Sequence, residues 1–172
     1  HEGKLYKAER LCRYYLQKHP HHIEGMRLLA QVGSRLYILD DAEFLLESCL
    51  EFDPNHHLAR LDYIAVLHKR QKFAKALQQA ELLREKQPGN PSFETAYASE
   101  CVATGQYDTA LAIYQRVLQS FPDNHHIHLM RGHALKTVGK SDQAVQSYRS
   151  AYENRKNFGD AYWSLANLKT YR

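Results

Sequence analysis

A fixed spacing of 34 residues constrains this chain more than any other feature of its sequence. Four of its five prolines follow one another at that interval: Pro20, Pro54, Pro88 and Pro122. Five alanines keep the same step: Ala8, Ala42, Ala76, Ala110 and Ala144. Such a period indicates a repeat protein, in which each repeat packs on its neighbours and the stack presents an extended surface. The period therefore favours a binding function over an enclosed catalytic site.

The repeats come into register when each begins two residues after a boundary proline, so that the alanines stand at position 20 and the prolines at position 32. Position 8 is small in all repeats but one: Ala30, Ile64, Ala98, Gly132 and Ala166. Small side chains are needed where two helices cross closely, and proline ends a helix because it cannot continue one. Each repeat is therefore predicted to be a pair of helices.

This pattern resembles the tetratricopeptide repeat, in which 34 residues form two antiparallel helices with the same three positions. The resemblance covers the whole chain and implies an all-α fold, a right-handed superhelical α-solenoid in a single array over residues 1–172. A partial repeat takes residues 1–22, full repeats take 23–56, 57–90, 91–124 and 125–158, and 159–172 form the first helix of an incomplete repeat. The chain departs from the family at position 4, where Met26, Arg60, Glu94 and His128 replace a large aromatic residue.

The apolar spacing predicts ten helices, near 3–18, 22–35, 38–52, 56–69, 72–86, 91–103, 106–119, 125–137, 140–153 and 159–171. Gly105 and Gly139 are predicted to turn the chain within a repeat. Asn or Asp in the segments 53–55 and 122–124 are predicted to cap the helices that follow.

The composition excludes several classes of function. A net charge of +4, from 23 basic and 19 acidic residues, is too small to indicate nucleic-acid binding. No apolar run approaches the roughly 18 residues of a membrane span. Cys12, Cys49 and Cys101 are odd in number and lack CxxC spacing, which favours a reduced, cytoplasmic protein with buried, inert thiols.

Two short patterns suggest chemistry, and both are better explained by the repeat. The segment Gly139-Lys140-Ser141 resembles the end of a phosphate-binding loop, but such a loop needs a preceding strand, and a helix is predicted there. The histidines cluster at repeat boundaries, and no cluster offers the four ligands of a structural zinc site. The sequence therefore predicts no catalytic residue, no metal and no cofactor.

The resemblance also implies which residues face the concave groove, because certain first-helix positions tend to line it in this family. The candidate binding residues are Arg27, Gln31, Arg35, Asp62, His68, Lys69, Thr95, Ser99, His133, Lys136, Trp163 and Asn167. This lining is polar with an excess of basic groups, so we expect a protein or extended acidic peptide as partner. The carboxylate clamp of chaperone-binding relatives is not matched, since Asp62 stands where the clamp needs asparagine.

Residues 161–172 carry a second resemblance, to the segment that joins the repeats to the catalytic domain in bacterial tetratricopeptide-linked sulfotransferases. It implies a non-catalytic recruiting or assembly segment of such an enzyme. The alternatives are a stand-alone adaptor and a segment of another enzyme, such as a glycosyltransferase. The apolar face around Trp163 also lacks a second helix to cover it, which suggests self-association.

Overall fold

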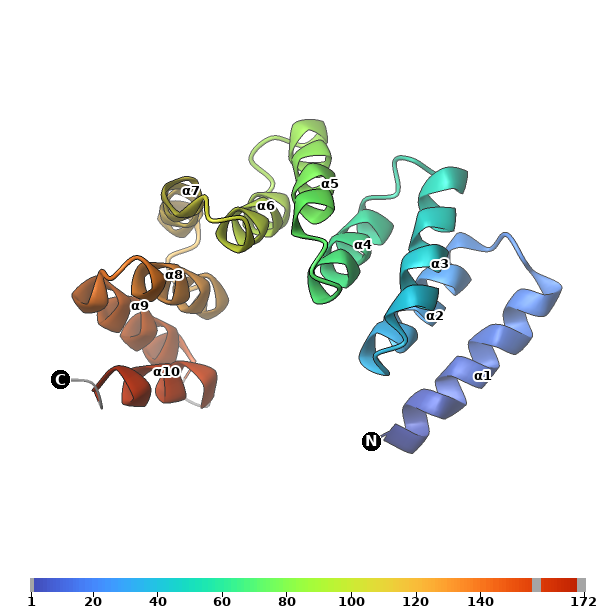
Figure 1. The fold of residues 1–172 in the computed structure, drawn as a ribbon, viewed down its shortest axis with the longest axis horizontal. Coiled ribbons are helices and arrows are strands. Elements are labelled where there is room, and N and C mark those ends of the chain that lie inside the picture. Colours follow the sequence, from blue (N-terminus) through green and yellow to red (C-terminus); the bar gives the residue numbers. More distant parts are fainter. Residues whose placement is uncertain (1, 156–158, 170–172) are drawn as a thin grey trace. The chain divides into compact units, whose positions relative to one another are not determined.

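The computed structural model describes residues 2–155 and 159–169, and within them every regular element is an α-helix. Figure 1 shows these helices along the chain. They are α1 (Glu2–Lys18), α2 (Ile23–Arg35), α3 (Leu39–Phe52), α4 (His57–Lys69), α5 (Phe73–Lys86), α6 (Pro91–Ala103), α7 (Tyr107–Ser120), α8 (His125–Thr137), α9 (Ser141–Asn154) and α10 (Gly159–Lys169). The predicted helices are confirmed to within one or two residues, except that the expected last two residues of α10 lie outside the described part. The all-α fold is confirmed, while its arrangement as one right-handed array stays a prediction.

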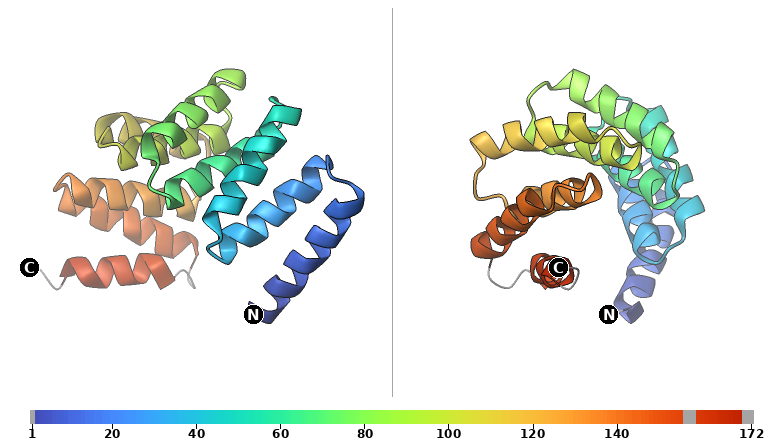
Figure 2. Two further views of the ribbon diagram at one scale, coloured as in Figure 1. Left: turned by 45° about the vertical axis from the view of Figure 1, so that its right-hand side comes forward. Right: turned by 60° about the vertical axis from the view of Figure 1, so that its left-hand side comes forward.

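The chain divides into two compact units, residues 1–86 and 87–172. In the first unit each helix from α1 to α5 packs on the next, and α2 also packs on α4. Figure 2 shows two further views of these packed helices. The core contains Leu46, Leu67 and Leu83, all fully buried. Ala42 and Ala76 are also fully buried, as the close helix crossings require.

In the second unit the helices also pack in chain order, α6 on α7, α7 on α8, α8 on α9 and α9 on α10, and α6 additionally contacts α8. Its largest fully buried side chains are Tyr114 and Tyr148. Ala110 and Ala144, at position 20 of their repeats, have no exposed surface either, as the close helix crossings of this unit require. Leu165 of α10 packs on the same core as Tyr148.

Four helices begin at a capping side chain that stands at the last position of the preceding repeat. His22 Nδ1 accepts from Gly25 N at 3.0 Å, and His56 Nδ1 accepts from Ala59 N at 3.1 Å. In the second unit the caps are Asn90 and Asn124. The predicted Asn124 cap is confirmed. The prediction for segment 53–55 is wrong. Asp53 Oδ1 accepts a hydrogen bond from Asn55 N within the turn, and the imidazole of His56 caps α4 instead.

The turns within the four full repeats share a left-handed backbone at position 15. Gly105 and Gly139 have φ values of 82° and 78°, so their predicted role as turn residues is confirmed. Tyr37 and Gln71 hold the same place with φ values of 61° and 60°. Side chains with a Cβ rarely adopt this conformation, and it costs them roughly 1–2 kcal/mol per residue. Two of the four turns are therefore strained.

Candidate peptide-binding surface

A hollow of about 200 Å³ opens in the first unit among α2, α3 and α4. Its apolar wall includes Ala30, Leu46 and Val66, each at most 2% exposed. Four of the predicted binding residues line it together with Ser34 and Ala65: Gln31, Arg35, Asp62 and Lys69. Gln31 and Ala65 both stand at position 9 of their repeats, and Arg35 and Lys69 both stand at position 13, whereas Asp62 contributes from position 6 of the second repeat. The hollow therefore brings together four of the twelve predicted binding residues, and their role in binding stays a prediction.

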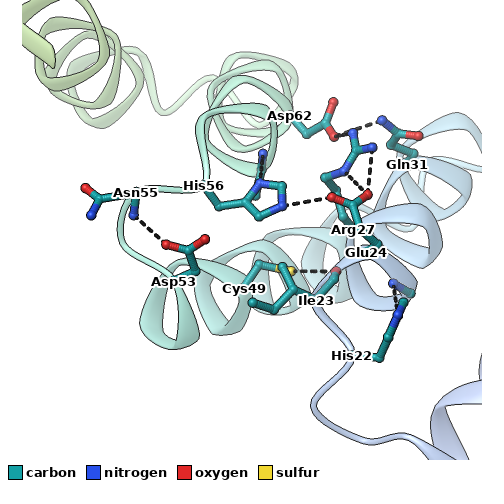
Figure 3. A network of polar contacts seen from close by, with 12 residues as sticks. His22, Ile23, Glu24, Arg27, Gln31, Cys49, Asp53, Asn55, His56 and Asp62 are labelled. Carbon is teal, nitrogen blue, oxygen red and sulfur yellow. Dashed lines mark hydrogen bonds and ion pairs between the residues drawn. The ribbon is translucent and has the colours of Figure 1, made fainter.

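A chain of polar contacts runs from the first turn of α4 to the hollow (Figure 3). His56 Nε2 lies 2.8 Å from Glu24 Oε1, and since His56 Nδ1 accepts the helix-capping bond, Nε2 is the donor. Arg27 Nη2 lies 2.9 Å from Glu24 Oε2, and Arg27 Nη1 lies 3.0 Å from Asp62 Oδ2. Gln31 Nε2 donates to the same oxygen of Asp62 at 2.8 Å.

This network fixes the charges on one side of the hollow. Burial opposes ionisation of Glu24, but the hydrogen bonds from Arg27 and His56 outweigh it and lower the pKa of Glu24. Burial likewise opposes the charge of Arg27, while Glu24 and Asp62 raise the pKa of its guanidinium. Arg27 therefore joins α2 to α4 between two carboxylates, and its positive charge is balanced within the protein. The predicted basic character does not come from Arg27.

The opposite side of the hollow is positive. Lys69 Nζ donates to Ser34 O at 3.0 Å and to Ser34 Oγ at 2.8 Å, both of which are neutral acceptors. Arg35 is exposed. Neither cation forms an ion pair with a carboxylate of a described residue. His68, another of the predicted binding residues, does not line the hollow, and its ring lies against Phe73 at 5.3 Å between centroids.

In the second unit the predicted residues do not gather at one hollow. Thr95 Oγ1 donates to Pro91 O at 2.7 Å, and Ser99 Oγ donates to Thr95 O at 2.9 Å, so both hydroxyls bond their own helix. Thr95 also lines a separate hollow of about 230 Å³ with His126. Trp163 is 68% exposed on α10, and Asn167 is exposed on the same helix.

His133 of α8 is held by a buried neighbour. The hydroxyl of Tyr148 lies 3.0 Å from His133 Nδ1. Burial raises the pKa of Tyr148 to about 12, so this phenol stays protonated and donates. Burial, and then the charge of Lys136, lower the pKa of His133. Both effects oppose a positive charge on His133, so this side chain is less suited than Lys136 to pair with an acidic ligand.

Sequence reasoning missed Tyr37, which is 77% exposed in the turn between α2 and α3. The Lys69 ammonium lies 5.7 Å from the centroid of its ring. The signal that identifies Tyr37 is its place at position 15, where Gly105 and Gly139 supply glycine.

The described residues provide no clear site for metal binding or for a phosphate-binding loop. Among residues 2–155 and 159–169, no three His, Cys, Asp or Glu side chains come together as ligands for a metal ion. Gly139 lies in the turn after α8, and this preceding helix fits the repeat interpretation rather than a phosphate-binding loop. None of the described helices is long and apolar enough to cross a membrane.

Comparison with known proteins bears on the fold. A protein of Parabacteroides merdae with tetratricopeptide repeats superposes with a TM-score of 0.90 at 18% identity, covering 98% of this chain and 66% of that one. A thermophilic protein of Thermus thermophilus with the same repeats gives 0.84 at 16% identity, covering 98% and 92%. YrrB, described as having an unusual peptide-binding site, gives 0.65 at 17% identity, covering 93% and 82%.

Two further comparisons concern the sequence alone. No curated protein matches the chain. The family model described as tetratricopeptide repeat matches residues 27–157, which is most of the chain. This chain therefore belongs to the tetratricopeptide repeat family.

Proposed function

We propose that this chain is a non-catalytic binding module that holds an extended, acidic protein segment along the first helices α2 and α4. The observation that carries the proposal is the hollow, where Arg35 and Lys69 stand without a carboxylate partner among the described residues. Groups that remain charged without an internal counter-ion favour a ligand that brings one. The wider family fold supports a binding role because repeat arrays expose long surfaces.

The two sides of the hollow suit different parts of a peptide. Asp62 Oδ2 accepts from Arg27 and Gln31, while Asp62 Oδ1 receives no hydrogen bond from a described residue. That oxygen is placed to accept from a backbone N–H of an extended chain. On the other side, Arg35 and Lys69 offer charged donors to an acidic side chain, whose methylene groups would cover Ala65 and Val66.

Charge reversal at the hollow tests the proposal. A fluorescein-labelled peptide of alternating glutamate and proline is extended and acidic, and its binding to the full chain is measured by fluorescence anisotropy. The double variant Arg35→Glu/Lys69→Glu is expected to weaken binding at least about tenfold, or about 1.4 kcal/mol. Added salt is expected to weaken binding to the wild type, because exposed charges are screened over about 8–10 Å.

The matched control is Lys4→Glu/Lys7→Glu, which makes the same change in net charge on exposed positions of α1. If the control variant lost as much affinity as the double variant of the hollow, only overall charge would matter and the assigned site would be wrong. Self-association is the competing use of the exposed surface, since Tyr162 and Trp163 are 63% and 68% exposed. Light scattering detects it as a larger mass that does not respond to salt.

We also propose, from the resemblance of residues 161–172, that the parent protein is a bacterial sulfotransferase and that this segment recruits or assembles partners for it. A stand-alone adaptor and a segment of a glycosyltransferase are the alternatives. The three free, buried cysteines support a reducing, cytoplasmic location. The parent gene tests the proposal: phosphate-binding motifs encoded after Arg172, and sulfate transfer by the full product, support it, whereas another catalytic domain overturns it.

A further inference from the structure

Tyr37 combines two costly features in one residue. Its backbone is left-handed, with φ of 61°, in a turn where the other unit uses glycine. Its ring is 77% exposed, so burial of the ring in the core does not offset the strain. Non-glycine residues in this backbone region concentrate at binding and active sites, and the observed strain is a reason to look for function.

The contacts of Tyr37 connect it to the hollow between α2 and α4. Its ring faces the Lys69 ammonium, 5.7 Å from the ring centroid, and Lys69 lines the hollow. Two of the three N–H donors of Lys69 are used on Ser34, which leaves one donor for another acceptor. The ring and Ser34 together hold the ammonium in place at the edge of the hollow.

The carboxylates that follow Tyr37 in the sequence do not neutralise this edge. Asp40 pairs with Arg70, and Asp41 lies 3.3 Å from Arg13. Asp62, on the other side of the hollow, is bonded by Arg27 and Gln31. The local excess of positive charge at the turn therefore has no carboxylate partner among the described residues.

We propose that Tyr37, Lys69 and Arg35 form a subsite for a single carboxylate side chain, Asp or Glu, of the bound segment. Lys69 and Arg35 donate to the carboxylate, and Tyr37 is a positioning residue that holds the Lys69 ammonium toward it. This inference rests on the proposed peptide-binding function and names the side chain that the α2–α3 end of the hollow recognises. It lies at the turn within a repeat rather than at the helix positions used by the carboxylate clamp.

The turn of the next repeat supplies a matched control. Gln71 occupies the same repeat position with nearly the same φ, 60°, and is exposed. Glycine at either position relieves the left-handed strain, so Tyr37→Gly and Gln71→Gly are both expected to raise the midpoint of denaturant unfolding. Only Tyr37→Gly is expected to weaken binding of the glutamate–proline peptide, by about three- to fivefold, the value of an exposed cation–π contact.

If Tyr37→Gly is more stable than the wild type and still binds the peptide more weakly, the loss of binding cannot come from a loss of structure. Such a result would assign Tyr37 a positioning role. Tyr37→Phe keeps the ring beside Lys69 and is expected to bind within about twofold of the wild type. Amidating the C-terminus of the peptide is expected to leave affinity unchanged, because a side-chain carboxylate is the ligand.

Four other outcomes would each contradict a specific part of the proposal. Equal affinities for Tyr37→Gly and Gln71→Gly, with the wild type still binding, would remove the subsite and leave the proposed function standing. Loss of affinity in Tyr37→Phe as large as in Tyr37→Gly would remove the role of the ring. Loss of binding on amidation would make the terminal carboxylate the ligand. A wild type that does not bind the peptide would overturn the proposed function together with the subsite.

Discussion

Replacing Gly132 with alanine is expected to destabilise the second unit by about 3 kcal/mol, near the upper end of overpacking effects. A Cβ at this position would lie 2.4 Å from Tyr148 Cε1 and 2.6 Å from Tyr148 Cδ1. Tyr148 is fully buried, and its hydroxyl is hydrogen-bonded to His133. The ring therefore cannot move aside without losing its buried packing and this hydrogen bond. The midpoint of denaturant unfolding measures the effect.

The control for this variant is Gly159→Ala, at the start of α10, where a Cβ would meet nothing within 4 Å. A second variant tests the cause directly: in the background of Tyr148→Leu, the cost of Gly132→Ala is expected to fall, because the aromatic ring that it strikes is gone. Equal unfolding midpoints for Gly132→Ala and the wild type would show that the α8–α9 crossing is looser than described.

Neutralising Glu43 is expected to destabilise the first unit by about 2 kcal/mol. Its carboxylate is buried on α3, with 6% of the side chain exposed, and lies 2.5 Å from Arg70, 2.8 Å from Lys72 and 3.6 Å from Lys75. Removing one partner of a buried ion pair costs about 3–5 kcal/mol. The lysines are about two-fifths exposed and can be hydrated again, so we expect less than that range.

Glu43→Gln keeps the side-chain volume and removes only the charge, so the loss in stability reports electrostatics. Glu51→Gln is the control, because Glu51 is exposed on the same helix. Unfolding by urea is preferable to guanidinium here, since the salt of guanidinium screens the interaction. A cost for Glu43→Gln no larger than that of Glu51→Gln would contradict the described network between α3 and the α4–α5 turn.

The sequence predicts the helices well because the determinants of a repeat are local and periodic. Ala42 and Ala110 are small at the crossings, and the prolines end the second helices, so the 34-residue spacing is enough to place both. The left-handed turns at Gly105 and Gly139 follow from the same register. These features need no knowledge of which side chains meet across repeats.

Features that depend on which side chains contact each other across helices could not be predicted. Arg60 and Glu94 replace the expected aromatic at position 4, yet both are buried. Arg60 donates to Pro54 O at 2.7 Å and to the side chain of Gln79, and burial lowers the pKa of its guanidinium. Glu94 accepts from Arg116 at 2.7 Å. In both cases a partner on the second helix makes burial of the polar group tolerable.

At the candidate site, too, repeat position predicts some features, whereas others depend on contacts between side chains. Repeat position alone predicts that Gln31, Asp62 and Lys69 share a surface, and the hollow brings them together. It does not predict that Arg27 is balanced by Glu24 and Asp62, since Asp62 lies 35 residues away in the sequence. The net charge of a surface depends on such pairs, so the positive side had to be located from the contacts.

If the hollow of α2 and α4 receives an acidic peptide, the amide chemical shifts of its lining residues change on binding, and mapping these shifts is the most direct test. Uniformly ¹⁵N-labelled full chain is titrated with the unlabelled glutamate–proline peptide at low salt. We predict that the largest shifts fall in residues 30–37 and 62–69 and disappear in Arg35→Glu/Lys69→Glu. Shifts concentrated instead on α10, or spread evenly over both units, would contradict the claim.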